Sequence, residues 1–443
     1  MKQTPGDTMP RTADAIVIGA GVIGGSIALE LTRLGLDVVV VDKGGAAGHG
    51  STSASSAIIR FNYSTFDGVA TSWEAKHYWE NWPDHLGFHD ESGLATFQRT
   101  GMVMLDVPVA PRERVTALLD QVGVAYEEWD AATLRARIPV IDAGKYWPPK
   151  RIDDEAFFAD ASEEIGGLYM PDAGYVDDPQ LAAHNLVAAA QSLGGELQLN
   201  REVTEVLRRA GRVAGVRLSD GSEIASRVVV NAGGPWSSRI NSLARVGEDF
   251  SIHVRPMRQE VHHLPAPAGY STEHAAGPSI ADMDLGTYMR PAPGNKILVG
   301  GTEPACDPME WIGDPDASSP SVTASSWARQ TTRAARRLST LTVPVQPKGV
   351  AGVYDVADDW APIYDRTELP GFYVAIGTSG NQFKNAPLAG RFLATLIDRV
   401  EAGHDHDASP LQFVGEHTRN TINLGSFSRK RPFNAETTGT VMG

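Results

Sequence analysis

Apolar and polar positions follow a definite order over residues 13–43, ADAIVIGAGVIGGSIALELTRLGLDVVVVDK. A short apolar run leads into a glycine turn, a stretch with helical spacing follows, and a second apolar run ends in Asp42. This order predicts a buried strand, an amphipathic helix and a second buried strand, which together form one βαβ unit.

Three glycines mark the turn of this unit. Gly19, Gly21 and Gly24 form the pattern G-x-G-x-x-G between the first strand and the helix. Glycine at these positions permits a tight turn, close approach of a pyrophosphate to the backbone amides, and close packing of helix on strand. Asp42 ends the second strand at a spacing suited to a ribose hydroxyl pair. The unit therefore predicts a dinucleotide site, without distinguishing NAD from FAD.

A further buried strand is predicted much later in the chain. Residues 202–238, EVTEVLRRAGRVAGVRLSDGSEIASRVVVNAGGPWSS, indicate a three-part β element and then an apolar strand at 228–230 that leads into a glycine turn and a helix start. Such a wholly apolar strand is typical of a parallel sheet that is covered on both faces. We expect it to return the chain to the first domain, so that separate segments build the cofactor site.

A third glycine-rich turn lies in YVAIGTSGNQFKNAPLAGRFLATLI, residues 373–397. A helix is predicted to begin near Gly380, with Lys384 on its first turn. A cation is unfavourable there because the helix macrodipole already places positive charge at that end. We therefore expect an anion to be held by Lys384 and the helix amides together.

Strand patterns elsewhere predict a second domain. GLATFQRTGMVMLDVP and the stretch from about 254 to 302 indicate a mainly antiparallel sheet. The expected fold class is α/β, with a Rossmann-type dinucleotide-binding domain and an antiparallel-sheet substrate domain. The first is expected at 10–90, 163–247 and 347–403, and the second at 91–162 and 248–346.

Residues 404–443 are polar and carry no periodic pattern. We expect them to form a tail that lies on the surface or caps a neighbour. The basic cluster in SRKRPF, residues 429–431, is interpreted as a solvated patch.

The size and the net charge of the chain limit the kinds of molecule that it is expected to bind. The 443 residues are more than one hydrophobic core usually supports. The chain has 54 Asp plus Glu against 39 Lys plus Arg, which gives a formal net charge of −15. That charge disfavours nucleic acid and anionic membranes. The single cysteine, Cys306, suits a reducing compartment, and no metal site or membrane span is expected. We expect a cytoplasmic protein, and its oligomeric state is left open.

Four blocks in the same order carry a resemblance to a known family: GAGVIGGS, SSAIIRFNYS, RVVVNAGGPWS and GTSGNQFKNAPLAG. Over about residues 13 to 400 the chain resembles the FAD-dependent family of D-amino acid oxidase, glycine oxidase and monomeric sarcosine oxidase, the DAO family. The resemblance implies the glutathione-reductase-like DAO fold and FAD as the cofactor. It also implies an amine substrate with a carboxylate, and dioxygen or another electron acceptor.

The resemblance also implies a site. Arg60 and Lys384 would grip the substrate carboxylate, Tyr288 would line the pocket, and Lys296 is the candidate for the lysine that promotes reaction with oxygen, although a solvated hairpin lysine is the simpler interpretation. FAD would be bound by Gly19, Gly21, Val22, Ile23, Gly24, Asp42, Lys43, Ser51, Thr52, Ser55, Ser56, Val203, Ala232, Gly233, Trp236, Gly352, Gly380, Asn381, Gln382, Phe383 and Lys384.

The chain departs from the family where some members attach the flavin covalently. The position that matches the linking cysteine of sarcosine oxidase is about Gly352, which has no nucleophile. We therefore expect FAD to be bound non-covalently.

The expected function is FAD-dependent oxidation of the C–N bond of an amino acid or N-methyl amino acid to an imine, which water hydrolyses, with demethylation for an N-methyl substrate. Two alternatives stay open: a dehydrogenase of the same fold that uses another electron acceptor or a 2-hydroxy acid donor, and a flavin-carrying subunit of a larger complex.

Overall fold

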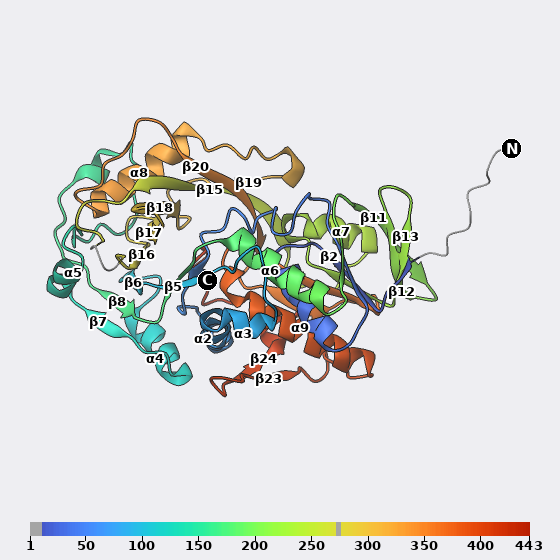
Figure 1. The fold of residues 1–443 in the computed structure, drawn as a ribbon. Coiled ribbons are helices and arrows are strands. Elements are labelled where there is room, and N and C mark those ends of the chain that lie inside the picture. The colour runs from blue at the N-terminus through green and yellow to red at the C-terminus, as the bar shows by residue number, and fades with distance from the viewer. Residues whose placement is uncertain (1–10, 272–275) are drawn as a thin grey trace.

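The computed structural model describes residues 11–271 and 276–443 (Figure 1). A six-stranded sheet lies at the centre of one half of the molecule, and five of its strands are parallel. In spatial order the strands are β10 (Glu196–Gln198), β3 (Val38–Val41), β2 (Ala15–Ile18), β14 (Val228–Asn231), β22 (Phe372–Ile376) and the antiparallel edge strand β21 (Ile363–Arg366).

Both faces of this sheet are covered, which explains its continuous apolar strands. Alternate residues of β2, such as Val17, pack against three helices on one face, and the intervening ones, such as Ile16, pack on the other. The helices are α1 (Val22–Arg33), α6 (Pro179–Ser192) and α9 (Ala386–Glu401), which lie side by side (Figure 1). The second face carries α7 (Ser237–Ala244) and a sheet of β1 (Arg11–Thr12), β13 (Glu223–Ala225), β12 (Arg212–Leu218) and β11 (Val203–Arg209).

A nine-stranded, mainly antiparallel sheet forms the other half of the molecule (Figure 1). Among its described strands, β16 and β6 alone pair in parallel. Its strands are β19 (Glu310–Trp311), β15 (Val254–Pro265), β18 (Lys296–Gly301), β17 (Thr287–Ala292), β16 (Ser279–Asp282), β6 (Met102–Leu105), β8 (Gly167–Met170) and β7 (Glu127–Trp129), with β20 (Gly349–Ala357) paired to β15. The helices α5 (Ala131–Arg137) and α8 (Ala324–Arg337) pack on it.

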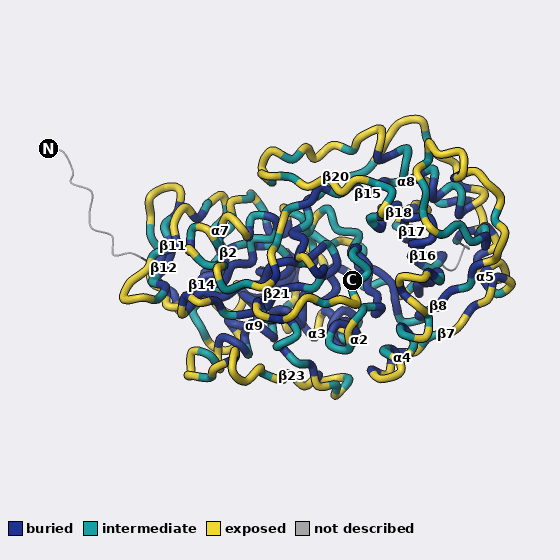
Figure 2. The backbone as a smooth tube through the Cα atoms, turned by 180° about the vertical axis from the view of Figure 1, so that it is seen from behind, coloured by how far each residue is buried: buried dark blue, intermediate teal, exposed yellow. Residues whose placement is uncertain are grey.

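The remaining elements lie outside the two large sheets. They are α2 (Phe66–Glu80), α3 (Trp82–Leu86), α4 (Arg112–Val122), the small sheet of β4 (Ile58–Ile59), β9 (Gly174–Val176) and β5 (Phe97–Arg99), and the hairpin of β23 (Gln412–Val414) and β24 (Thr421–Asn423). Short 3₁₀ helices lie at Glu155–Phe158, Gly234–Trp236, Pro315–Ala317, Phe383–Asn385 and Leu424–Phe427. Figure 2 shows that the central strands are buried and that the loops at the rim are exposed.

The helix expected near Gly380 begins later. Residues 377–382 form a turn, a 3₁₀ helix spans Phe383–Asn385, and α9 starts at Ala386. Gly380 has a φ of +68°, which is outside the right-handed helical region. Lys384 therefore lies in the 3₁₀ helix that precedes α9 and not on the first α-helical turn.

The expectation of a surface tail after residue 403 is wrong. Ile422, Leu424 and Phe427 are buried, and they pack in the same core as α9. Apolar side chains spaced irregularly along an extended segment give no periodic signal, so the pattern missed them.

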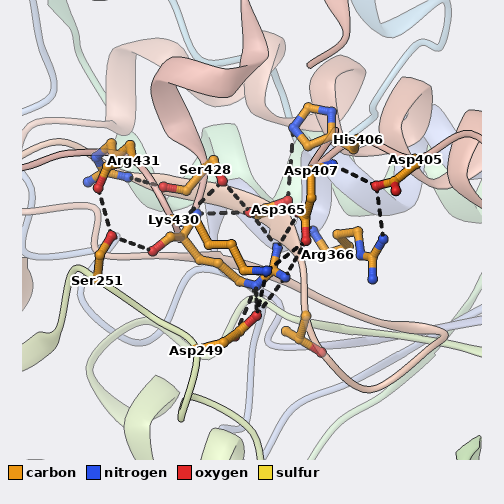
Figure 3. A network of polar contacts seen from close by, with 12 residues as sticks. Asp249, Ser251, Asp365, Arg366, Asp405, His406, Asp407, Ser428, Lys430 and Arg431 are labelled. Atoms are coloured by element: carbon orange, nitrogen blue, oxygen red, sulfur yellow. Dashed lines mark hydrogen bonds and ion pairs between the residues drawn. The ribbon is translucent and has the colours of Figure 1, made fainter. Parts of the chain in front are cut away.

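The interpretation of residues 429–431 as a solvated patch is also wrong. Arg429 is 1% exposed and forms ion pairs with Asp249, Asp365 and Asp407. Figure 3 shows these three acids gathered near Lys430. Arg431 is buried and pairs with Asp359, and Lys430 alone is half exposed. Acidic partners brought together from distant segments hold these arginines, so the basic run anchors the segment to the protein.

Candidate cofactor and substrate site

One elongated cavity joins the dinucleotide motif to the boundary of the two large sheets. Most residues expected to bind FAD line it. They are Gly19, Gly21, Val22, Ile23, Asp42, Lys43, Ser51, Thr52, Ser55, Ser56, Val203, Ala232, Gly233, Trp236 and residues 380–384.

The glycine motif fits a dinucleotide because no side chain has room beside it. Gly19 has a φ of +111°, and a Cβ atom there would lie 2.4 Å from the carbonyl oxygen of Ala232. A Cβ atom on Gly24 would lie 1.9 Å from the carbonyl oxygen of Gly19. Gly24 does not line the cavity, but its missing side chain lets α1 approach the turn closely.

Two polar side chains fix the backbone around this turn. The Asp42 carboxylate accepts hydrogen bonds of 2.6 Å from the amides of Ala20 and Gly44. The Thr52 hydroxyl accepts one of 3.1 Å from the Val22 amide at the start of α1. The turn, the acid and the N-terminus of a 12-residue helix therefore converge on one end of the cavity, which is a suitable arrangement for a dinucleotide.

The other end of the cavity holds Arg60, which follows β4, and Lys384, from the 3₁₀ helix before α9. Both side chains are buried, and they meet around Tyr63. The Arg60 guanidinium lies 4.8 Å and the Lys384 Nζ 5.2 Å from the centre of its ring. Two segments far apart in the sequence thus place two cations in one pocket.

The hydrogen bonds of these cations are few and mostly to the backbone. Lys384 Nζ donates to the carbonyl oxygen of Asn381 at 2.6 Å and to the Tyr63 hydroxyl at 3.0 Å. Burial, and then the charge of Arg60, hold the pKa of Lys384 well below its usual value. Burial likewise lowers the pKa of Arg60. An anion placed between them would relieve both effects.

Two tyrosines form the wall of the cavity between its ends. The buried Tyr288 hydroxyl lies 2.6 Å from Ser56 Oγ, and burial raises its pKa to about 12. Tyr354 also lines the cavity and packs against Gly380, where a Cβ atom would lie 2.3 Å from its ring.

Two expected site residues lie elsewhere. Lys296 is exposed at the start of β18, where it pairs across the hairpin with Ala292 and does not line the cavity. Lys296 directly follows the turn between β17 and β18. This is the position expected for a solvated hairpin lysine. Gly352 does not line the cavity either, although the next residue, Val353, does.

Sequence reasoning missed several residues that line the cavity. Val441 and Met442 reach it from the segment predicted to be a surface tail, and Tyr354 and Asp355 follow the position of Gly352 on β20. His49, Arg201 and Arg239 lie along it as well. The alternation of side chains along β20 was the one feature of the sequence that could have indicated Tyr354 as a cavity residue. Nothing in the local pattern indicated Val441.

The part of the chain that the structure describes holds no group of three His, Cys, Asp or Glu residues that would bind a metal ion. Within the same residues, no helix combines the length and the apolar character needed to cross a membrane.

Known proteins resemble this chain in sequence and in fold. The model of the DAO family, described as FAD dependent oxidoreductase, matches residues 14–396. The glycine oxidase of Geobacillus kaustophilus is 26% identical over 409 residues, which cover 90% of this chain and 96% of that protein.

A 4-methylaminobutanoate oxidase (formaldehyde-forming) of Paenarthrobacter nicotinovorans is 25% identical, and the match covers 94% of this chain and 47% of that protein. Among solved structures, the L-proline dehydrogenase of P. horikoshii superposes with a TM-score of 0.74 at 22% identity, over 96% of this chain and 98% of that one.

Proposed function

Because this chain belongs to the DAO family of FAD-dependent oxidoreductases, we propose that it oxidises the C–N bond of a small amine that carries a carboxylate. Bound FAD supplies the electron acceptor for such an oxidation. The turn at Gly19, the Asp42 carboxylate and residues 380–384 would hold FAD, and the absence of a nucleophile at Gly352 fits non-covalent binding.

The single observation that carries the substrate proposal is the convergence of Arg60 and Lys384 on Tyr63. The planar guanidinium matches both oxygens of a carboxylate, and a buried cation binds an anion far more strongly than an exposed one. Arg60 and Lys384 would hold the carboxylate and orient the amine-bearing carbon. Such orientation contributes several kcal/mol, on the order of 7–11 for a well-aligned pair of reactants.

The amine must bind without a proton, because a nitrogen lone pair assists departure of a hydride from the neighbouring carbon. The two cations at the other end of the substrate disfavour a further positive charge. Hydrolysis of the imine would release formaldehyde and the demethylated amine from an N-methyl substrate, or a 2-oxo acid and ammonia from a primary amine. The names of the two relatives, glycine oxidase and 4-methylaminobutanoate oxidase, both denote acids with an amino group and so support this class.

Anaerobic mixing tests the proposal. The purified FAD-loaded protein is mixed with glycine, sarcosine, L-proline and a set of 2-hydroxy acids while the absorbance of oxidised flavin is followed. Bleaching by an amino acid or N-methyl amino acid supports the proposal. Bleaching by 2-hydroxy acids alone would replace it with the hydroxy-acid alternative, and no bleaching by any donor would favour the subunit role.

The same preparation then identifies the acceptor. The exposed position of Lys296 leaves the expected oxygen-reactive lysine out of the cavity, and this favours an acceptor other than dioxygen. Faster reoxidation by a dye than by dioxygen is the expected result.

A further inference from the structure

Residues 440–442 lie buried at the Arg60 end of the cavity, and Val441 uses both of its backbone polar groups there. Its carbonyl oxygen accepts a 2.6 Å hydrogen bond from Arg60 Nη2. Its amide donates a 2.7 Å hydrogen bond to Glu303 Oε2. A cation and a carboxyl group thus bind the two ends of one residue.

This pair of contacts has the chemistry of amino acid recognition. The amide nitrogen and the carbonyl carbon of Val441 are bonded to one Cα, as are the amine nitrogen and the carboxylate carbon of an α-amino acid. We propose that the Val441 backbone occupies the place of the substrate, and that the substrate is an α-amino acid or N-alkyl α-amino acid. Its carboxylate would replace the carbonyl at Arg60, and its amine would replace the amide at Glu303.

The inference rests on the proposed function and adds three things to it. It places the amine on the carbon next to the carboxylate, it assigns the amine to Glu303, and it requires residues 440–442 to leave when substrate binds.

Glu303 has the surroundings expected of a group that takes a proton from an arriving amine. One of its oxygens accepts the hydrogen bond from the Val441 amide, and the other accepts a 3.0 Å hydrogen bond from Gln259 Nε2, so both of its described partners are uncharged. Burial raises its pKa to about 8, against the opposing effect of the Val441 amide. Its φ of +46° is uncommon for a residue with a side chain, and such backbone strain is concentrated at functional sites.

The segment that carries Val441 can leave without disturbing its anchor. Arg429 and Arg431 hold the chain in buried ion pairs, whereas Pro432, Phe433, Ala435 and Glu436 are exposed. Within the end of the segment, the Thr438 amide donates to the Gly443 carbonyl oxygen and the Gly443 amide to that of Thr440, while Val441 and Met442 pack in the hydrophobic core. Substrate must therefore bind tightly enough to offset the loss of these apolar contacts when the segment leaves.

Val441→Pro tests displacement, because proline has no N–H to donate to Glu303. If the segment competes with substrate, the apparent affinity is reduced by the fraction of molecules in which the pocket is filled. We expect the KM for sarcosine, glycine or L-proline, whichever is the best substrate, to fall at least threefold in the variant. Ala435→Pro, at an exposed position of the same segment, should leave KM unchanged. An unchanged or raised KM in Val441→Pro would show that residues 440–442 form a wall and would overturn the inference.

Glu303→Gln tests recognition of the amine. Glutamine still accepts a hydrogen bond from the Val441 amide, but it cannot take up the proton that the amine must lose on binding. The KM for the same amino acid should rise at least tenfold, while the dissociation constant of propionate, a carboxylate without an amine, should not rise. Equal effects on both ligands would mean that Glu303 acts on the carboxylate or on the fold, and would contradict its assignment.

Hydrogen exchange gives a readout that does not depend on turnover. Propionate at saturation should increase amide exchange in a peptide that contains residues 438–443, because it displaces the Val441 carbonyl from Arg60. Exchange that stays unchanged while propionate binds would refute displacement. Failure of the whole proposed function is distinguishable from these outcomes, because then no amine would bleach the flavin in the wild type or in any variant.

Discussion

Lys384 Nζ donates a 3.0 Å hydrogen bond to the hydroxyl of Tyr63, from which 321 positions of sequence separate it. The Arg60 guanidinium lies over the same tyrosine ring. Two buried cations beside one another are costly unless an anion accompanies them. This arrangement is the basis of the carboxylate site proposed above.

Replacement of Lys384 by methionine should weaken substrate binding. Methionine has a similar length and no charge, so it removes one charged hydrogen bond, worth about 1.5–3 kcal/mol. That free energy corresponds to about a 10- to 150-fold rise in KM. Steady-state kinetics measure it, and the flavin content of the purified variant should equal that of the wild type. A KM within twofold of the wild type would remove Lys384 from the site.

Lys296→Met is the matched substitution at the exposed lysine. Because Lys296 does not line the cavity, we expect KM and the rate of flavin reoxidation by dioxygen to stay within twofold of the wild type. Loss of oxygen reactivity in this variant alone would mean that Lys296 acts on the flavin after all.

Gly19→Ala should abolish FAD binding. The added methyl group would lie 2.4 Å from a backbone oxygen, and the φ of +111° is unfavourable for alanine. Gly35→Ala provides the control, since Gly35 has a φ of +80° and no atom within 4 Å of the added group. We expect the control to lose only about 1 kcal/mol of stability and to bind FAD normally. Flavin fluorescence titration compares the two variants.

Arg429→Met should destabilise the fold strongly, because it leaves the fully buried Asp365 without the guanidinium that balances its charge. Breaking a buried ion pair from one side costs about 3–5 kcal/mol. Lys430→Met removes the half-exposed neighbour that contacts the same Asp249 and Asp407, and should cost no more than about 1 kcal/mol. Urea unfolding followed by tryptophan fluorescence measures both changes.

The same network predicts a loss of stability in acid. Burial opposes ionisation of Asp407, but hydrogen bonds from Arg429 and Lys430 outweigh it and lower the pKa of this carboxyl. A lowered pKa contributes stability that is present above the ordinary carboxyl pKa and is lost as the pH falls through the lowered value. Asp407→Asn should therefore be less stable than the wild type at neutral pH, and the difference should shrink toward about pH 2. A difference that does not depend on pH would contradict the ionic origin.

Ionisation of Glu303 should make stability fall as the pH rises, which is the direction opposite to that predicted for Asp407. Its folded-state pKa is raised from 4.5 to about 8, so the stability associated with its protonated form is lost as the pH rises through that window. Glu303→Gln does not titrate, and its Tm relative to that of the wild type should increase from about pH 5 to about pH 9. A constant difference in Tm across this range would mean that Glu303 ionises normally.

Much of the fold could be predicted because its signals are local. Local sequence is enough to predict the glycine turn after residue 18, the acid at 42 and the apolar strand at 228–230. All three adjoin or belong to one sheet. The pattern could also place Arg60 and Lys384 in one site through the resemblance to a family, although the structure alone shows that Tyr63 lies between them.

The rest depends on contacts that no local pattern encodes. Val441 reaches Arg60 from 381 positions away, and Arg429 is neutralised by acids from three separate segments. A polar, aperiodic segment has the composition of a surface tail whether or not it meets such partners. Burial of Ile422, Leu424, Phe427, Arg429 and residues 440–442 therefore followed only from the assembled structure.

The central claim is that Arg60 and Lys384 together bind a carboxylate, and one equilibrium constant tests it most directly. The dissociation constant of propionate, measured from the change in the flavin spectrum, is compared between the wild type and the Arg60→Gln/Lys384→Met double variant, both loaded with FAD. The account predicts binding at least 100-fold weaker in the double variant, with FAD retained. Equal affinity for propionate in the two proteins would contradict it.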